Sequence, residues 1–89
     1  MTSDFTLSTI ESMLPTFSID RIAWLIQKDW KQVYFGAAPY LQAMAQMNSV
    51  SDKFGFDDGE SVVRYFLANA SSWRGPVAKL VKKELRNRV

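Results

Sequence analysis

The sequence predicts an all-α protein, a compact single-domain bundle of four to five short helices. Apolar residues recur at intervals of three and four along most of the chain, and no segment alternates apolar and polar residues over a useful length. Three prolines and four glycines divide the chain into five segments. With 89 residues, 47% of them hydrophobic and 13% aromatic, the chain has the composition of one globular domain, and we expect residues 1–89 to form it.

The first two predicted helices cover residues 6–14 and 19–34. Pro15 separates them, because proline disfavours helical backbone at the residue before it. Ser18 is the expected N-cap of the second helix. Apolar residues follow helical spacing in both, namely Leu7, Ile10 and Leu14 in the first, then Ile19, Ile22, Ala23, Ile26, Trp30, Val33 and Tyr34 in the second.

Three further helices are predicted at residues 38–47, 58–70 and 76–88. Pro39 and Pro76 stand near the start of two of them, where the fixed φ of proline suits a first helical position. Asp57 followed three residues later by Glu60 is typical of an N-cap with a capping-box partner. We expect one core built from the helical stripes, with Ile22, Ile26, Trp30, Val33, Met44, Val63, Phe66, Leu67, Leu80 and Val81 as its members.

The formal net charge of +2 conceals an uneven distribution along the chain. Residues 1–60 hold four Lys/Arg against eight Asp/Glu, a net charge of −4. Residues 61–89 hold seven Lys/Arg against one acid, a net charge of +6. This uneven distribution of charge says more about possible binding partners than the net charge does.

A basic stripe follows the last predicted helix. Its cations fall within roughly 100° of arc on a helical wheel, and they are Lys79, Lys82, Lys83 and Arg86. Arg74 precedes the helix and extends the stripe, whereas Glu84 lies on the other side of the wheel. A stripe of this kind fits phosphates or an acidic protein surface. The alternatives are a solvated helix face, or pairing with acids of this chain, such as Asp52, Asp57, Asp58 or Glu60.

Trp24 departs from the apolar pattern of its helix. It projects away from the apolar stripe together with three cations, Arg21, Lys28 and Lys31. A tryptophan among cations can stack on a base or anchor a partner protein. The favoured alternative is that the first segment covers the indole with Phe5, Leu7 or Ile10, because small domains use their aromatic residues for the core.

The chain lacks the residue types that most catalytic and metal sites require. It holds no cysteine and no histidine, and no phosphate-binding loop or hydrolase motif is present. Asp57, Asp58 and Glu60 do not fit a calcium loop, because Phe54, Phe56 and Tyr65 occupy ligand positions. We therefore expect no enzyme, no catalytic residue, no metal and no cofactor. No signal peptide or membrane span is evident, so a cytoplasmic location is expected.

Two functional hypotheses follow. The first is a non-catalytic protein-interaction module that binds another protein or a second copy of itself as a homodimer. It is motivated by three tryptophans, which a domain this small has difficulty burying, and by the uneven charge. The second is a nucleic-acid-binding domain. Its candidate surface consists of Lys79, Lys82, Lys83 and Arg86, with Arg74 and the face of Arg21, Trp24, Lys28 and Lys31.

Overall fold

The structure is a computed structural model that describes residues 6–54 and 57–89 of the chain. The described part contains five α-helices: α1 (Leu7–Met13), α2 (Ile19–Asp29), α3 (Ala38–Met44), α4 (Gly59–Ala68) and α5 (Pro76–Arg88). A 3₁₀ turn, η1 (Leu14–Thr16), follows α1. Two strands of two residues each, β1 (Lys53–Phe54) and β2 (Asp57–Asp58), form an antiparallel pair before α4. The predicted all-α class is confirmed, with this small hairpin as an addition.

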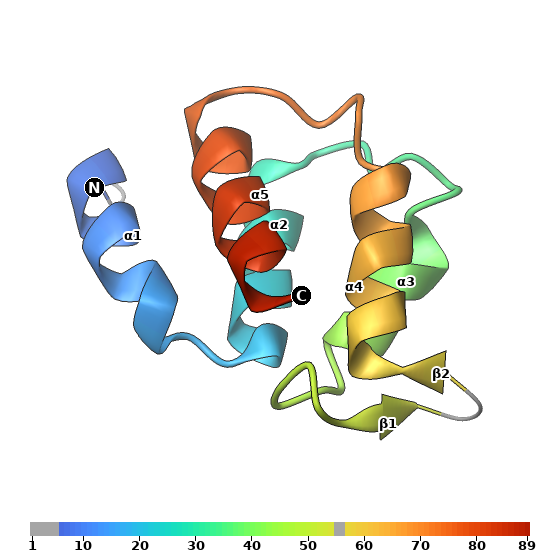
Figure 1. Cartoon of the computed structure of the whole chain (residues 1–89). Helices are drawn as coiled ribbons and strands as arrows, with labels where there is room; N and C mark the ends of the chain where they lie inside the picture. The colour runs from blue at the N-terminus through green and yellow to red at the C-terminus, as the bar shows by residue number, and fades with distance from the viewer. Residues whose placement is uncertain (1–5, 55–56) are drawn as a thin grey trace.

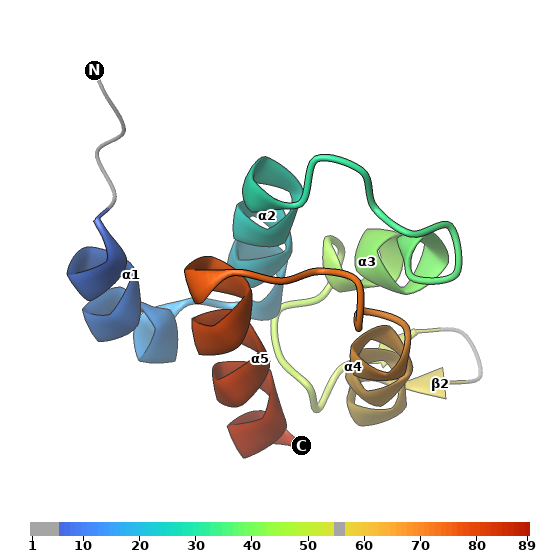
Figure 2. The same ribbon diagram turned by 90° about the horizontal axis from the view of Figure 1, so that it is seen from above.

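Helix α5 lies at the centre of the bundle, although it comes last in the sequence (Figure 1). It packs against α1, α2 and α4, and α3 packs against α2 and α4. Seen from above, α1 lies on one side of α5, and α3 and α4 lie on the other (Figure 2). The basic stripe of the sequence therefore belongs to the helix that joins the bundle together.

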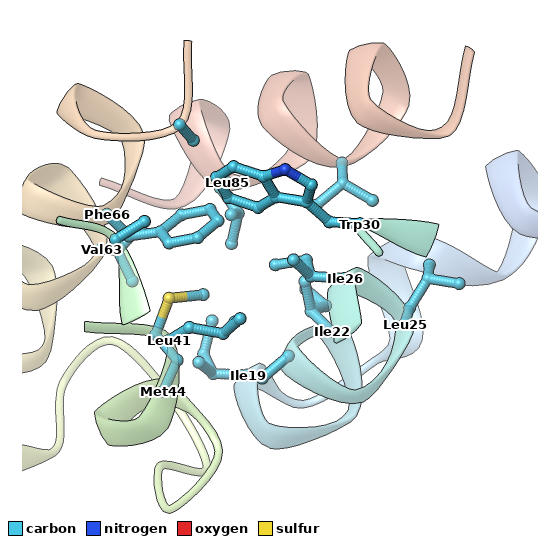
Figure 3. Close-up of a cluster of buried hydrophobic side chains, with 14 of the residues drawn as sticks. Ile19, Ile22, Leu25, Ile26, Trp30, Leu41, Met44, Val63, Phe66 and Leu85 are labelled. Atoms are coloured by element: carbon cyan, nitrogen blue, oxygen red, sulfur yellow. The ribbon is translucent and has the colours of Figure 1, made fainter. Parts of the chain in front are cut away.

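The core is apolar throughout the described residues, which include no buried polar or charged side chain. Side chains from α2, α3, α4 and α5 converge on one cluster (Figure 3). Most of the predicted core residues are buried there, namely Ile22, Ile26, Trp30, Met44, Val63, Phe66 and Val81. Val33, Leu67 and Leu80 are only partly buried and pack against the edge of this core.

Helix α2 ends at Asp29, five residues before the predicted boundary. Trp30 has φ −91° and ψ 95°, an extended conformation that terminates the helix. Its indole stacks on Trp73 with ring centroids 5.8 Å apart and an interplanar angle of 14°. It also meets the ring of Phe66 edge-on at 6.3 Å. These contacts outweigh the helical periodicity that continues to Tyr34, which is 45% exposed rather than part of the apolar stripe.

The other helix boundaries differ less from the prediction. Helix α1 ends at Met13, where η1 continues the chain, and α5 spans the expected residues. Helix α3 ends at Met44, because the N–H groups of Gln46 and Met47 donate to carbonyls three residues earlier. Such bonds belong to a tighter turn than the α-helix.

The N-cap of α4 is Asp58, not Asp57 as the sequence pattern predicts. The Asp58 carboxylate accepts the backbone N–H of Ser61 at 2.7 Å. Pairing of β2 with β1 determines where the helix begins. The ladder pairs Lys53 with Asp58, so Asp58 is still part of a strand and α4 begins at the next residue, Gly59. Gly59 follows at a crowded point, where an added Cβ would lie 2.6 Å from the carbonyl oxygen of Val50.

The C-terminal turn of α5 is tied to the segment that links α1 and α2. Arg88 donates from Nη1 to the Phe17 carbonyl at 2.7 Å and from Nη2 to the Leu14 carbonyl at 2.8 Å. Its Nε also pairs with Glu84 at 2.8 Å. One side chain thus joins positions more than 70 residues apart in the sequence.

Candidate functional site

The connection between α4 and α5 is anchored by Trp73, which is 2% exposed. Its indole stacks on Trp30, and its Nε1 donates to the Asp29 carboxylate at 2.9 Å. The connection is therefore fixed to the C-terminal end of α2. Arg74, the next residue, is exposed, and Gly75 has φ 113°, a conformation that favours glycine.

Lys82 reaches back from α5 to this connection. Its Nζ donates to the Trp73 carbonyl at 2.6 Å and lies 5.9 Å from the Trp73 ring centroid. Burial lowers the pKa of Lys82, and the nearby charges of Arg86 and Arg74 lower it further. The carbonyl holds the ammonium group in place but brings no negative charge to offset these cations.

Four cations surround one pocket of about 240 Å³ beside the α4–α5 connection. We call it the basic pocket, and its lining residues are Trp73, Arg74, Gly75, Ala78, Lys79, Lys82 and Arg86. No carboxylate is among them. The pocket also adjoins the N-terminus of α5, whose partial positive charge has the same sign as the four side chains. The arrangement is suited to an anion.

The structure divides the predicted basic stripe between two surfaces. Lys79, Lys82 and Arg86 share one face of α5 and line the basic pocket together with Arg74. Lys83 points toward α1, where it lines a groove with Glu11 and Leu7. Lys79 lines this groove as well as the basic pocket, so Lys83 lies beside the pocket but does not line it.

The acids of the central loop are engaged locally rather than with the stripe. Asp52 accepts the N–H groups of Asn48 and Ser49, and Asp58 caps α4. Among the side chains that the structure describes, the ion pairs are Glu60–Arg64 at 3.4 Å and Glu84–Arg88 at 2.8 Å. Asp57 is described only as part of the backbone of β2, and its side chain is left out of this comparison. The intramolecular pairing considered from the sequence is therefore not observed for the described acids.

The second predicted surface, around Trp24, is separate from the basic pocket. Arg21 lies 5.8 Å from the ring of Phe17, and Lys28 lies 5.4 Å from that of Trp24. Asp20 lines the same depression as Trp24 and Arg21, so this depression holds both an acidic and a basic side chain. Lys31 follows the end of α2 and does not belong to this helical face, contrary to the prediction.

Trp24 itself is 44% exposed. Of the residues expected to cover it, Ile10 is buried in the core and Leu7 lines the groove against α5. Phe5 lies outside the described residues.

Sequence reasoning missed an exposed aromatic pair in the connection between α2 and α3. Phe35 is 81% exposed and Tyr34 is 45% exposed, and their ring centroids lie 4.9 Å apart. The signal was two adjacent aromatic residues directly before Gly36, which marks a turn. The apolar spacing predicts a helix as far as Tyr34 and so places this residue on a buried face, which is why the exposed pair was missed.

Comparisons of the chain with models of protein families, with curated proteins and with solved structures found no significant match. Among the described residues, no group of three or more acidic, His or Cys side chains is arranged to hold a metal ion. None of the described helices has the length and apolar character needed to cross a membrane. Function is therefore inferred from the surfaces described above.

Proposed function

We propose that this protein is a non-catalytic nucleic-acid-binding module whose basic pocket contacts backbone phosphates. The observation that supports it is the gathering of Arg74, Lys79, Lys82 and Arg86 around one pocket without a lining carboxylate. Most contacts between proteins and nucleic acids are made to phosphates, and they come largely from Arg, Lys and helix N-termini. All three are present at this pocket.

The electrostatics of Lys82 give the proposal its physical basis. Burial lowers the pKa of Lys82, and repulsion from Arg86 and Arg74 lowers it further. The two arginines therefore add to the positive potential at its Nζ. A bound phosphate replaces this repulsion with attraction, and it releases the counterions condensed on the nucleic acid. Binding should therefore weaken steeply as salt increases.

The test is a salt titration of binding to a fluorescently labelled 20-base-pair DNA duplex, followed by anisotropy. We expect the double variant Arg74→Gln/Lys79→Gln to reduce the slope of log K against log[salt] by about 2, since each phosphate contact contributes about 0.9. Lys53→Gln/Arg64→Gln removes the same charge from exposed positions outside the pocket and is the matched control.

Two results would contradict this proposal. One is the absence of binding by the wild-type protein at low salt, both to the duplex and to a single strand of 20 nucleotides. The other is an equal loss of slope in both double variants, which would mean that total charge rather than the pocket determines binding. Circular dichroism of both variants establishes that they are folded.

A second candidate function is the protein-interaction module, with a second copy of the chain as partner. The 81% exposure of Phe35 favours it, because exposed aromatic side chains are enriched at protein interfaces. Light scattering over a series of concentrations tests it. For either function we propose a cytoplasmic location, which the absence of cysteine supports.

A further inference from the structure

The exposed pair Tyr34 and Phe35 belongs to the α2–α3 connection, and the α4–α5 connection contributes Trp73, Arg74 and Gly75 to the basic pocket. The α2–α3 and α4–α5 connections both cross the top of the molecule in Figure 1, and Figure 2 looks down on them. The two connections leave the C-terminal ends of α2 and α4. They also touch, because a Cβ added at Gly36 would lie 2.5 Å from Tyr34 Cε2 and 3.0 Å from Asn69 Oδ1.

Covalent and packing links place the aromatic pair within reach of the pocket. Asn69 begins the α4–α5 connection, and Arg74 near its end lines the pocket. Trp30 stacks on Trp73, the residue before Arg74. Tyr34 is four residues beyond Trp30, so their Cα atoms are at most about 14 Å apart. A single strand that follows the two connections would therefore contact both features.

We propose that the basic pocket and the Tyr34–Phe35 pair form one binding surface for single-stranded nucleic acid. Phosphates of the strand occupy the pocket, and an unpaired base stacks on the exposed ring of Phe35. This inference rests on the nucleic-acid-binding function proposed above and adds a choice of substrate. Tyr34 supports the ring of Phe35 from one side, at a centroid distance of 4.9 Å.

The choice of a single strand follows from what an exposed ring can contact. In a duplex both faces of each internal base are already stacked, so Phe35 would gain no contact with them. In a single strand every base presents an unpaired face, and stacking on an aromatic side chain tolerates any sequence. An electropositive groove combined with exposed aromatic rings is the recurring design of proteins that bind single strands.

The experiment compares a labelled 20-nucleotide oligothymidine with a duplex of 20 base pairs at one low salt concentration. We expect Phe35→Leu to weaken oligothymidine binding about fivefold or more, the loss that corresponds to one stacked base. The affinity of Phe35→Leu for the duplex should equal that of the wild-type protein. The slope of log K against log[salt] should also be unchanged for both nucleic acids. Tyr65→Leu is the matched control, because Tyr65 is 47% exposed and contacts the ring of Tyr40 rather than the proposed surface.

The outcomes separate this inference from the proposed function. If the wild-type protein binds neither nucleic acid, the proposed function fails and the inference fails with it. If it binds both equally and Phe35→Leu changes nothing, phosphate binding stands and the single-strand inference is overturned. Equal losses in Phe35→Leu and Tyr65→Leu would also overturn it.

A photochemical measurement tests the same surface in the wild-type protein, without any substitution. Oligothymidine carrying one 5-iodouracil in place of thymine is irradiated in the complex, and the cross-linked peptide is sequenced by mass spectrometry. We expect the cross-link at Phe35 or Tyr34, in the tryptic peptide of residues 32–53. A cross-link confined to Trp24 or Tyr65 would overturn the proposed surface.

Discussion

Asp58 shows at the scale of one residue how a cap couples stability to pH. Its carboxylate accepts the N–H of Ser61, and this hydrogen bond lowers the pKa of Asp58 below its ordinary value of 3.8. A lowered pKa in the folded state means that the stabilisation is present above the unfolded pKa and is lost as pH falls through the folded one. We therefore expect Asp58→Ala to lower the free energy of unfolding at neutral pH.

The difference in unfolding free energy between wild type and Asp58→Ala should shrink as the pH falls through the lowered pKa of Asp58, because the wild-type carboxyl becomes protonated there. Urea denaturation at several pH values measures it. Asp58→Asn is the control, since asparagine caps a helix without titrating in this range. A gap between wild type and Asp58→Ala that stays constant down to acid pH would contradict the expected contribution.

Residues whose role depends on local spacing were predictable, whereas residues whose role depends on a distant partner were not. Ile22, Ile26 and Phe66 lie on apolar stripes and are buried as expected. Tyr34 continues the same stripe and is exposed, because Trp30 leaves the helix to stack on Trp73, 43 residues away. Periodicity carries no information about such a partner.

The attachment of α5 to the α1–α2 segment belongs to the scale of elements. Arg88 donates to the carbonyls of Phe17 and Leu14, and its side chain is only 20% exposed. Charge-assisted hydrogen bonds with little solvent access contribute more than ordinary ones. We expect Arg88→Gln to lower the free energy of unfolding by about 2 kcal/mol.

Hydrogen exchange locates this effect, because the amides of α1 should lose protection before those of α4. Arg64→Gln is the control, since Arg64 forms an exposed i,i+4 pair of the kind that contributes about 0.5 kcal/mol or less. Equal stability losses in the two variants would mean that Arg88 does not hold the elements together.

Helix boundaries followed from the sequence where the chain itself marks them. Pro76 and the apolar spacing beyond it indicate α5, which spans Pro76–Arg88. The hairpin of β1 and β2 has only two residues per strand, too few for a period of two to be visible. For the same reason the sequence pattern predicts Asp57, and not Asp58, as the N-cap of α4.

The oligomeric state is a property of the whole molecule, and we expect a monomer of 10.2 kDa. Two aromatic side chains offer at most about 500 Å² of contact area, whereas a stable interface buries about 800 Å² on each partner. The neighbouring basic pocket would also repel its copy. Light scattering of wild type and Phe35→Leu should give the same mass at every concentration.

A concentration-dependent mass near twice the monomer value, reduced by Phe35→Leu, would instead favour the homodimer. It would assign the exposed aromatic pair to a protein contact. The same experiment in high salt serves as the control, because screening removes the repulsion between pockets but leaves an apolar contact in place.

The charges of the candidate site were visible in the sequence, but their grouping was not. Lys79, Lys82 and Arg86 lie on one helical face by spacing alone. Whether Arg74 joins them depends on the fold of the α4–α5 connection, which Trp73 fixes against α2. Lys83 instead lines the groove next to α1, to which Lys79 also contributes. A helical wheel describes one helix and cannot distinguish these neighbours.

The central position of α5 has a consequence for the order in which the fold can assemble during synthesis. Earlier helices leave the ribosome without the helix against which α1, α2 and α4 pack. The pocket is assembled from α5 and from a connection seated on α2, so its cations take up their arrangement only after α5 has packed against α2. The arrangement of the pocket therefore depends on the packing of α5 against the helices that precede it in the sequence.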